Sequence, residues 1–422
     1  MSRTISDHTI DVENVSSNAV AVVEALRDSG YDAYLVGGCV RDLLLGRTPK
    51  DFDVATNATP EQVTTVFPKA RLIGRRFRIA HVRMRREVFE VSTFRRHIDD
   101  DGPVFDDLDH EAENGIILRD NVYGTLDEDA FRRDFTVNAL YYDPVDNTII
   151  DYVDGMTDVE SGTLRLIGDP EKRFREDPVR ILRALRFTAK LEFALEPATE
   201  AAIAPVCEFL TAIPAARLLD EFTKLFMHGS AVKAFELLEA HELVEILFPL
   251  PSSTLPLVMA ALRNTDERIR EDKPVTPAFL RAALLWEEYR LRCDETATGR
   301  NAQDGENNAA LAVISEQQHT IAIPKRYAMF IRDVWQLQPR LEKRSPKSLQ
   351  RLLEHRRFRA GYDFLVLRSQ SGDADPELAK WWTDIQELDP EARAQKVRKH
   401  APRRRRRRRR PRSEAAQASP QS

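Results

Sequence analysis

The sequence predicts an α+β head, a mixed sheet with flanking helices, followed by an all-α region and a disordered basic tail. Apolar strand-like runs, short helices and glycine turns alternate through residues 16–167, which is typical of an α+β unit. From Gly168 onward the apolar residues recur at helical spacing. Residues 396–422 hold twelve Lys and Arg residues against one acid, Glu414.

The head is expected to begin with a helix and to continue through a series of strands. Ser16 can cap a helix that carries Val20, Val23 and Leu26 on one face and stops at Gly30. An apolar run, a Gly-Gly pair and a short amphipathic stretch follow, and they predict a strand, a turn and a helix. The expected strands cover residues 34–36, 52–54, 79–82, 88–93, 137–142 and 148–152, and the expected short helix covers 40–45.

Two polar stretches are expected to be loops. His97–Gly115 is rich in Asp and Glu, but it lacks the ligand spacing and turn glycine of a calcium loop, so a mobile solvated loop is expected. Thr296–Asn308 is the second candidate loop. Trp335, Trp381 and Trp382 are expected in the helical core. Helices are expected at residues 178–191, 215–227, 231–247, 277–290, 327–337 and 347–367.

The composition describes a cytoplasmic globular protein. A chain of 422 residues with 42% hydrophobic and 31% charged residues can bury a large core and divide into two or three domains. No apolar run reaches membrane-spanning length and no leader-like segment opens the chain, so we expect no membrane contact. Cys39, Cys207 and Cys293 are far apart and odd in number, which favours buried free thiols over disulfides or a zinc site.

The C-terminal charge run predicts a solvated arm. Residues 396–422 carry a net charge of +11, and the rest of the chain therefore carries −16 of the total of −5. Such a like-charged block cannot fold on itself and is expected to meet a polyanion, for which RNA is the preferred interpretation. A tail without a specific partner, or one that binds anionic lipid, remains an alternative.

The strongest chemical signal is a Gly-Gly turn followed by an Asp-x-Asp pair. Asp51 and Asp53 lie two apart on an expected strand, so their carboxylates point the same way and repel each other. A divalent cation such as Mg²⁺ would relieve that repulsion. Gly37 and Gly38 precede a helix and can present backbone N–H groups to a phosphate. Surface acids at a strand end would explain the Asp pair alone, but the upstream glycines favour a site.

A third acid and an arginine come from a later segment. Asp134 lies at the mouth of another apolar strand and is the predicted partner of the Asp pair in holding two metal ions, about 4 Å apart in such sites. Arg133, beside it, would neutralise phosphate charge. A surface ion-pair cluster is the alternative for this Arg-Arg-Asp run.

The third block opens a helix at Pro178 and is suited to reading a nucleotide base. Asp177 can accept from an exocyclic amine while Arg180 donates to the adjacent ring nitrogen, a combination that accepts adenine or cytosine. Guanine and uracil carry an acceptor where adenine and cytosine carry the amine donor, and a donor where those bases carry the ring-nitrogen acceptor. Arg183, one turn further, could reach a triphosphate. The alternative is an ordinary amphipathic helix start with an exposed arginine stripe.

Together these blocks, within residues 34–187, resemble the class II tRNA nucleotidyltransferase and poly(A) polymerase family of bacteria. The resemblance implies a nucleotidyltransferase head, a helical neck that recognises the base and an RNA-binding helical body. It assigns catalysis and metal binding to Asp51, Asp53 and Asp134, and nucleotide contacts to Gly37, Gly38, Arg41, Arg133, Asp177, Arg180 and Arg183. The expected divisions are 1–15 (extension), 16–167 (head), 168–230 (neck), 231–395 (body) and 396–422 (tail).

That family contains two activities with the same head, polyadenylation of RNA 3′ ends and CCA addition to tRNA. The segments 49–61, 119–124 and 321–326 look like the polyadenylating branch, as does the arginine-rich tail. No His-Asp dipeptide occurs, which argues against the phosphohydrolase domain attached to some CCA-adding relatives. Template-independent polyadenylation is therefore the preferred function, CCA addition is the first alternative, and a catalytically inactive RNA-binding adaptor is the second.

The resemblance also sets the expected ligands and partners. ATP is the expected substrate, with two Mg²⁺ ions as cofactors. The expected partners are RNA 3′ ends of mRNA and small RNA, with the RNA-degradation machinery as a further candidate. A mutation of Asp51 that left tailing intact would favour the inactive adaptor.

Overall fold

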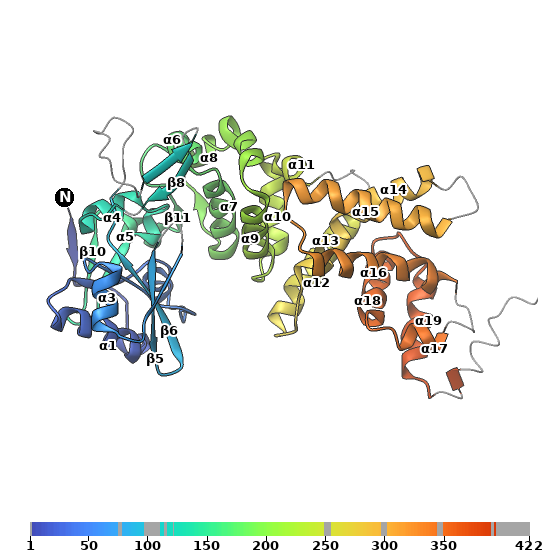
Figure 1. The fold of residues 1–422 in the computed structure, drawn as a ribbon, viewed down its shortest axis with the longest axis horizontal. Helices are drawn as coiled ribbons and strands as arrows, with labels where there is room; N and C mark the ends of the chain where they lie inside the picture. The colour runs from blue at the N-terminus through green and yellow to red at the C-terminus, as the bar shows by residue number, and fades with distance from the viewer. Residues whose placement is uncertain are drawn as a thin grey trace, which may run out of the picture. The chain divides into compact units, whose positions relative to one another are not determined.

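The computed structural model describes residues 2–74, 78–96, 110–113, 116–120, 122–248, 255–296, 302–343, 349–389 and 392–393. It divides into two compact units, Met1–Ala328 and Met329–Ser422, and each is described by itself (Figure 1). The predicted arm, residues 396–422, lies outside the described residues. No described helix is both long and apolar enough to cross a bilayer.

Within the described residues, the head is built on an eight-stranded sheet. Neighbouring strands are antiparallel except for β3 and β6, which are parallel, so the prediction of a mixed sheet is confirmed. In their order across the sheet the strands are β1 (Arg3–Ile5), β10 (Thr148–Asp151), β9 (Leu140–Asp143), β2 (Ala33–Val36), β3 (Asp53–Thr56), β6 (Glu87–Thr93), β5 (Ile79–Met84) and β4 (Arg71–Ile73).

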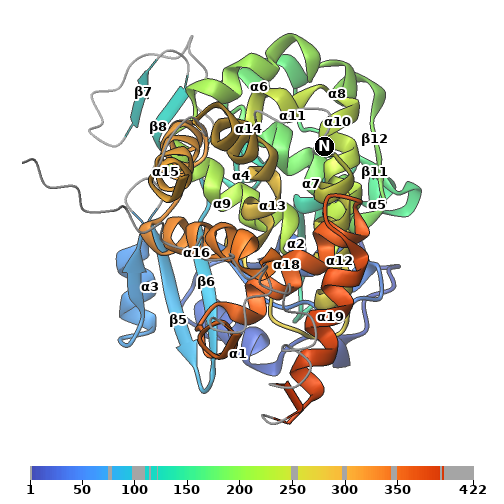
Figure 2. The same cartoon turned by 90° about the vertical axis from the view of Figure 1, so that its right-hand side faces the viewer.

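Helices flank this sheet as predicted. Helix α1 (Ser17–Asp28) contacts β2 and β3, and α3 (Pro60–Val66) contacts α1, β5 and β6. Figures 1 and 2 show α3 beside β5 and β6. The Oγ atom of Ser16 accepts from the backbone N–H of Ala19, so Ser16 caps α1 as expected. The buried face differs slightly from the prediction, because Val20 is only half-buried and Ala19, Val22, Val23 and Leu26 are buried.

The acid-rich stretch predicted as a loop contains a strand. Residues His110–Glu113 form β7, which pairs antiparallel with β8 (Ile116–Asp120). The loop prediction is wrong for these four residues, because the apolar segment that follows them supplies a partner for their backbone hydrogen bonds. Residues 97–109 and 114–115 lie outside the described part of the chain.

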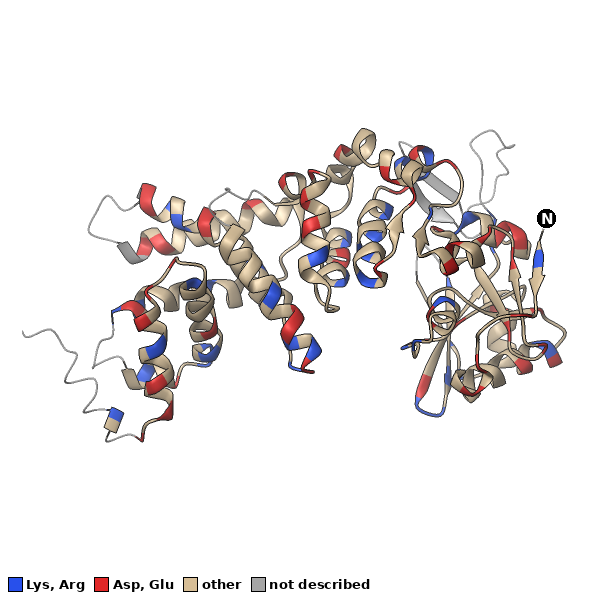
Figure 3. Cartoon of the chain, turned by 180° about the vertical axis from the view of Figure 1, so that it is seen from behind, with Lys and Arg blue, Asp and Glu red and all other residues tan. Residues whose placement is uncertain are grey.

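Short elements connect the sheet to the first helices of the all-α region. The segment predicted as a strand over 137–142 begins as a 3₁₀ turn, η2 (Thr136–Asn138), and becomes β9 only at Leu140. The basic residues of α7 appear as successive blue bands in Figure 3. The connecting elements are α2 (Gly38–Leu44), α4 (Leu126–Arg132), α5 (Gly155–Ser161), β11 (Thr163–Leu164), α6 (Pro170–Glu176), α7 (Val179–Leu191), β12 (Ala194–Leu195), α8 (Pro197–Ala201), η3 (Ala204–Ala212) and α9 (Ala215–Phe226).

The remaining helices of the first unit are broken more often than predicted. The helix predicted over 231–247 is two helices, because Glu242 has the left-handed φ of 59°. The helix predicted over 277–290 is interrupted at Leu285. The loop predicted at Thr296–Asn308 is wrong for its second half, because α15 begins at Ala302. These helices are α10 (Ala231–Ala240), α11 (Leu243–Leu247), α12 (Leu255–Arg270), α13 (Pro277–Leu284), α14 (Trp286–Thr296) and α15 (Ala302–Thr320).

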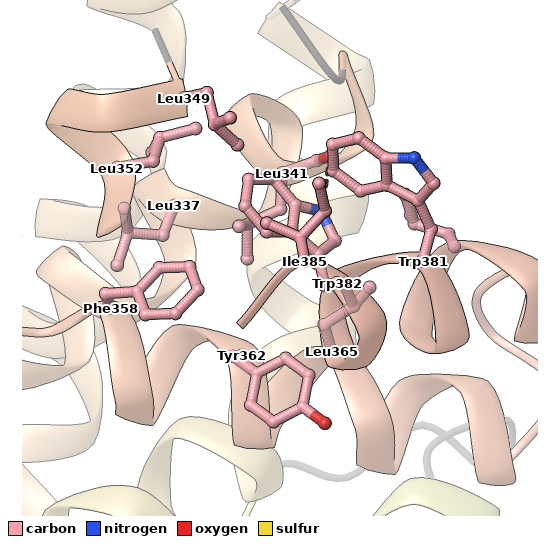
Figure 4. Close-up of a cluster of buried hydrophobic side chains, with 11 residues drawn as sticks. Leu337, Leu341, Leu349, Leu352, Phe358, Tyr362, Leu365, Trp381, Trp382 and Ile385 are labelled. Atoms are coloured by element: carbon pink, nitrogen blue, oxygen red, sulfur yellow. Dashed lines mark hydrogen bonds between the residues drawn. The ribbon is translucent and has the colours of Figure 1, made fainter. Parts of the chain in front are cut away.

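The second unit has its own apolar core. Trp382 is fully buried and donates its indole N–H to the carbonyl of Leu341 at 3.0 Å, and Trp381 lies edge-on to it (Figure 4). Trp335 is also fully buried, so the prediction for the three tryptophans is confirmed. Its helices are α16 (Lys325–Glu342, which starts in the first unit), α17 (Leu349–Leu353), α18 (Phe358–Gln370) and α19 (Pro376–Glu387).

Candidate active site

A glycine turn brings the start of α2 next to charged side chains. Gly37 has φ of 82°, a conformation that favours glycine, and it is the N-cap residue of α2. A Cβ atom at Gly37 would lie 3.9 Å from Nη1 of Arg133 and 3.9 Å from Oδ2 of Asp53. The expected close approach of this backbone to the site is therefore present.

The Asp pair lies where β3 begins. Asp53 is the first residue of β3 and is paired with Val36 of β2, while Asp51 is exposed and precedes the strand. Burial raises the pKa of Asp53 to about 6, and the negative charges of Glu90 and Asp51 add to this effect while Arg133 opposes it. A carboxylate that is disfavoured in this way is suited to binding a cation.

Glu90 is an acid beside Asp53 that the sequence analysis did not single out. It is the register partner of Asp53 across the parallel pair β3–β6, and its charge is the largest electrostatic contribution to the raised pKa of Asp53. Its Oε1 atom lies 3.4 Å from Nε2 of His81 on β5. The sequence feature that could have pointed to Glu90 is its position as a single acid between Phe89 and Val91, which are buried in an apolar strand.

Asp134 lies in different surroundings from those predicted. Its Oδ2 atom accepts from Nε of Arg183 at 2.9 Å, and its Oδ1 atom accepts from the backbone N–H of Phe135 at 2.8 Å and from Nδ2 of Asn138 at 3.3 Å. Burial acts to raise the pKa of Asp134, but the charge and hydrogen bonds of Arg183 lower it well below its usual range. The carboxylate is thus already neutralised by an arginine.

Asp134 and Asp53 have different charged neighbours. Those that act on Asp53 are Glu90, Arg133 and Asp51. Among the described residues, no three Asp, Glu, His or Cys side chains are assembled as a metal cluster, with either Asp134 or Glu90 as the third acid. The metal role of Asp134 stays a prediction, and the observed partner of its carboxylate is Arg183.

Arg133 is held by a buried acid that the sequence analysis did not single out. Asp129 on α4 is 1% exposed and accepts from Nε and Nη2 of Arg133 at 3.1 and 2.8 Å. Tyr141 donates its hydroxyl to the same carboxylate at 2.7 Å and lies under the guanidinium of Arg133. These contacts leave Nη1 of Arg133 on the side of Gly37, where a phosphate can be met.

Arg41 is 2% exposed and links three motifs. It donates to Oδ1 of Asp42 at 3.0 and 2.7 Å and to Oδ1 of Asn138 at 2.5 Å, and its guanidinium lies over the ring of Phe187. Because Asn138 in turn donates to Asp134, a continuous polar chain runs from α2 to Arg183 on α7. The observed contacts of Arg41 are with protein groups, and its predicted nucleotide contact stays a prediction.

The predicted base-reading pair lies at the junction of α6 and α7, and each member has its own protein partner. Arg180 donates to the carbonyl of Arg173 at 2.7 Å and to Oε2 of Glu176 at 3.2 Å. Asp177 accepts from Nη2 of Arg217 at 2.6 Å through Oδ2. Among the described residues, Oδ1 of Asp177 is buried without a hydrogen-bond partner, so one acceptor is available to a ligand.

Comparison with known proteins settles the family. A family model described as the poly A polymerase head domain matches residues 33–165. Models described as a probable RNA and SrmB-binding site of polymerase A and as a polymerase A arginine-rich C-terminus match residues 192–254 and 298–414. The chain is 45% identical over 401 residues to poly(A) polymerase I of Haemophilus influenzae, covering 92% of this chain and 88% of that protein.

The chain belongs to the bacterial poly(A) polymerase family. It is also 44% identical over 427 residues to poly(A) polymerase I of Escherichia coli O157:H7, covering 94% of this chain and 91% of that protein. The predicted resemblance is therefore confirmed. A CCA-adding enzyme of Lactobacillus johnsonii is 39% identical, but over 227 residues, or 54% of each chain.

Solved structures share this fold. The Bacillus stearothermophilus CCA-adding enzyme in complex with CTP has a TM-score of 0.56 and 28% identity, over 90% of this chain and 80% of that chain. The Thermotoga maritima CCA-adding enzyme complexed with tRNA has a TM-score of 0.61 and 20% identity, over 91% of this chain and 85% of that chain. The predicted fold class, a nucleotidyltransferase head followed by helical domains, is confirmed.

Proposed function

We propose that this chain transfers AMP from ATP to the 3′-hydroxyl of RNA without a template and releases pyrophosphate. In this reaction the 3′ oxygen forms a bond to the α-phosphorus of ATP, the bond from that phosphorus to the β-phosphate breaks, and the hydroxyl loses its proton. The observation that carries the proposal is the identity of about 44% over nearly the whole length of two poly(A) polymerases, combined with the acids that surround Asp53.

Asp51 and Asp53 are the proposed metal ligands, with Glu90 as the third acid. The raised pKa of Asp53 arises from burial and from these two neighbouring acids, so a divalent cation would remove a repulsion that the protein maintains. Hard carboxylate oxygens suit Mg²⁺. When bound, two Mg²⁺ ions would lower the pKa of the 3′-hydroxyl and stabilise the charge on the pyrophosphate.

The groups near Gly37 are proposed to bind the triphosphate. The backbone N–H groups of Gly37 and Gly38 can donate to phosphate oxygens because no side chain shields them. Arg133 supplies a positive charge, and its guanidinium is oriented by Asp129. Arg183 supplies a second positive charge, and its guanidinium is oriented by Asp134. Asp134 is thereby a positioning residue, which is the role that its observed contacts support best.

Asp177 and Arg180 are proposed to read the adenine edge. The free Oδ1 atom of Asp177 can accept from the amine at adenine N6, while Arg180 can donate to N1. Arg217 holds the other oxygen of Asp177, so the carboxylate is fixed before the base arrives. A guanine would leave the buried acceptor unsatisfied, at a cost of about 1–3 kcal/mol.

The roles of the individual regions, the RNA substrates and the protein partner are also part of the proposal. Residues 168–230 serve as the base-reading neck, 231–395 as the RNA-binding body and 396–422 as an RNA arm, behind an extension at 1–15 and a head at 16–167. The substrates are mRNA and small RNA in the cytoplasm, and the RNA-degradation machinery is the candidate protein partner.

A tailing assay tests the function. The purified chain is incubated with Mg²⁺ and each nucleoside triphosphate, using a generic RNA and a tRNA that lacks its 3′ end. Long tails made from ATP alone on both RNAs are expected. A stop after three defined nucleotides on the tRNA would instead identify a CCA-adding enzyme. A parent chain that binds RNA but extends neither substrate would favour the inactive adaptor. An Asp51→Ala variant that still extends RNA would place catalysis away from Asp51.

A further inference from the structure

Four basic residues from three separate segments lie close enough to act on one another electrostatically, and we call them the α7 basic cluster: Lys50, Arg186, Lys190 and His228. Lys50 directly precedes Asp51, Arg186 and Lys190 lie four residues apart on α7, and His228 follows α9. Partial burial lowers the pKa of Lys190, and among the charged neighbours Asp42 opposes this while Arg41, Arg186 and Lys50 add to it. The pKa of His228 is likewise lowered by burial and by Lys50, Lys190 and Arg186.

The charge of this cluster is not balanced by the protein. Within the described residues, no acid lies within 4 Å of Lys50, Arg186 or Lys190 as an ion-pair partner, and the Nε atom of Arg186 is buried without a hydrogen-bond partner. Three acids that act on the cluster are engaged by other cations. Arg41 donates to Asp42 at 2.7 Å, Lys224 donates to Glu221 at 2.9 Å, and Arg183 donates to Asp134 at 2.9 Å.

An aromatic ring holds Arg186 in place without using its N–H donors. The guanidinium of Arg186 lies 4.5 Å from the ring centroid of Phe187, which is itself fixed edge-on to Phe135 at 5.7 Å. Arg41 and Arg183 approach the same ring at 5.2 and 5.7 Å. Stacking orients the plane of the guanidinium and leaves its N–H groups without an acceptor on the ring.

We propose that the α7 basic cluster binds backbone phosphates of the RNA primer next to its 3′ end. This inference rests on the proposed function, because the 3′-hydroxyl must reach Asp51 and Asp53 and the phosphates that precede it must lie close by. Lys50 is adjacent in sequence to Asp51, and Figure 3 shows the basic residues of α7 in succession along the helix. Single-stranded RNA carries one negative charge per nucleotide and therefore matches a row of cations that lack acidic partners.

Lys190 is the member of the cluster that lies away from the groups proposed for ATP. It is about 15 Å along the helix axis from Arg180, given the rise of an α-helix, whereas Arg186 shares the ring of Phe187 with Arg183. The triphosphate already has Gly37, Arg133 and Arg183. The phosphates of ATP and of RNA share the same chemistry, however, and the experiment separates the two sources.

The test measures RNA binding and ATP use separately in the full chain. Lys190→Glu and Arg186→Gln variants are compared with the parent by anisotropy of a labelled single-stranded RNA without ATP, and the KM for ATP is then measured in the tailing assay. Each variant is expected to bind RNA about tenfold more weakly. The log–log salt slope should fall by about 0.7 for each phosphate that the variant no longer neutralises. The KM for ATP should stay unchanged in Lys190→Glu, and Lys190→Arg should bind RNA like the parent.

A matched control and a folding check accompany the variants. Lys69→Glu reverses the charge of another exposed lysine, in the head and outside both the cluster and the proposed RNA-binding body, and should bind RNA like the parent. Lys190 is exposed, so its variants test the proposal even if Arg186→Gln unfolds. Unchanged RNA affinity in Lys190→Glu, or a raised KM for ATP with normal RNA affinity, would overturn the proposal. RNA binding is measured without ATP, so it tests the proposed cluster alone. Loss of tailing in the parent would count against the proposed function and not against RNA binding by the cluster.

Discussion

Arg183 on α7 donates its Nε atom to Oδ2 of Asp134 at 2.9 Å, across 49 residues of sequence. The bond joins the Arg-Arg-Asp motif of the head to the helix that begins the base-reading block. It also occupies the carboxylate that the sequence analysis assigned to a metal ion. The bond to Arg183 and a metal role for Asp134 therefore compete for the Oδ2 atom.

Substitutions of Glu90 and Asp134 should change the Mg²⁺ dependence of the tailing rate in different ways. We expect Glu90→Gln to lower kcat by about 10²-fold and to raise the Mg²⁺ concentration needed for half-maximal rate, because it removes a negative charge beside Asp53. Asp134→Asn should instead raise the KM for ATP about tenfold, with an unchanged Mg²⁺ requirement, because Arg183 is then without its orienting acid. Steady-state rates over a Mg²⁺ titration distinguish the two.

The control for this pair is Glu13→Gln, since Glu13 is exposed and lies in the first 3₁₀ turn of the chain. It should behave like the parent. If Asp134→Asn raised the Mg²⁺ requirement and Glu90→Gln did not, Asp134 would be the third ligand after all.

The buried acid Asp129 makes stability depend on pH. Although burial opposes ionisation, Arg133 and Arg132 hold the pKa of Asp129 well below its ordinary value. Its folded-state pKa is thus depressed, so its contribution to stability is present above about pH 4 and is lost as the pH falls below that value. We expect Asp129→Asn to destabilise the protein by about 3–5 kcal/mol at pH 7, because Arg133 is left buried and unpaired.

Urea unfolding at pH 7 and near pH 3 measures this effect, and the difference between parent and variant should shrink at the lower pH. Asp127→Asn is a matched control on the same helix, because Asp127 is exposed and its replacement should cost under about 1 kcal/mol. Equal urea midpoints for the parent and Asp129→Asn at pH 7 would contradict the buried ion pair.

Asp177 is expected to decide base choice. Asp177→Ala removes the free acceptor, so kcat/KM for ATP should fall about 10- to 100-fold and the preference for ATP over GTP should narrow. Competition between ATP and GTP in the tailing assay gives this ratio. Glu171→Gln, an exposed acid on the preceding helix, is the control. An unchanged ratio in Asp177→Ala would move base recognition away from this residue.

Removal of the arginine-rich segment should weaken RNA binding without changing base choice. A chain ending at residue 395 loses a net charge of +11, so its log–log salt slope for single-stranded RNA should flatten by about 0.7 for each phosphate that the segment neutralised. Anisotropy titrations between low and moderate salt provide the slope. An identical slope with and without the segment would show that it does not contact RNA.

Some features of this protein follow from residues that are neighbours in sequence. Ser16 caps α1, Gly37 adopts a positive φ at the start of α2, and Asp51 and Asp53 flank the entry to β3, all within short windows where backbone conformation and capping decide the outcome. The same holds for the alternation of strands and helices that predicted the fold class. The motif blocks alone are sufficient to place the chain in its family.

Long-range pairing decided the rest. Glu90 meets Asp53 only because β3 and β6 pair in parallel, and Asp134 is neutralised only because α7 carries Arg183 to it. Likewise, Glu242 divides a continuous helical pattern by adopting a left-handed conformation. Sequence periodicity reports which face of an element is apolar. It does not report which element covers that face, or which basic residue pairs with a given carboxylate. Packing between distant segments decides both the covering element and the ion-pair partner.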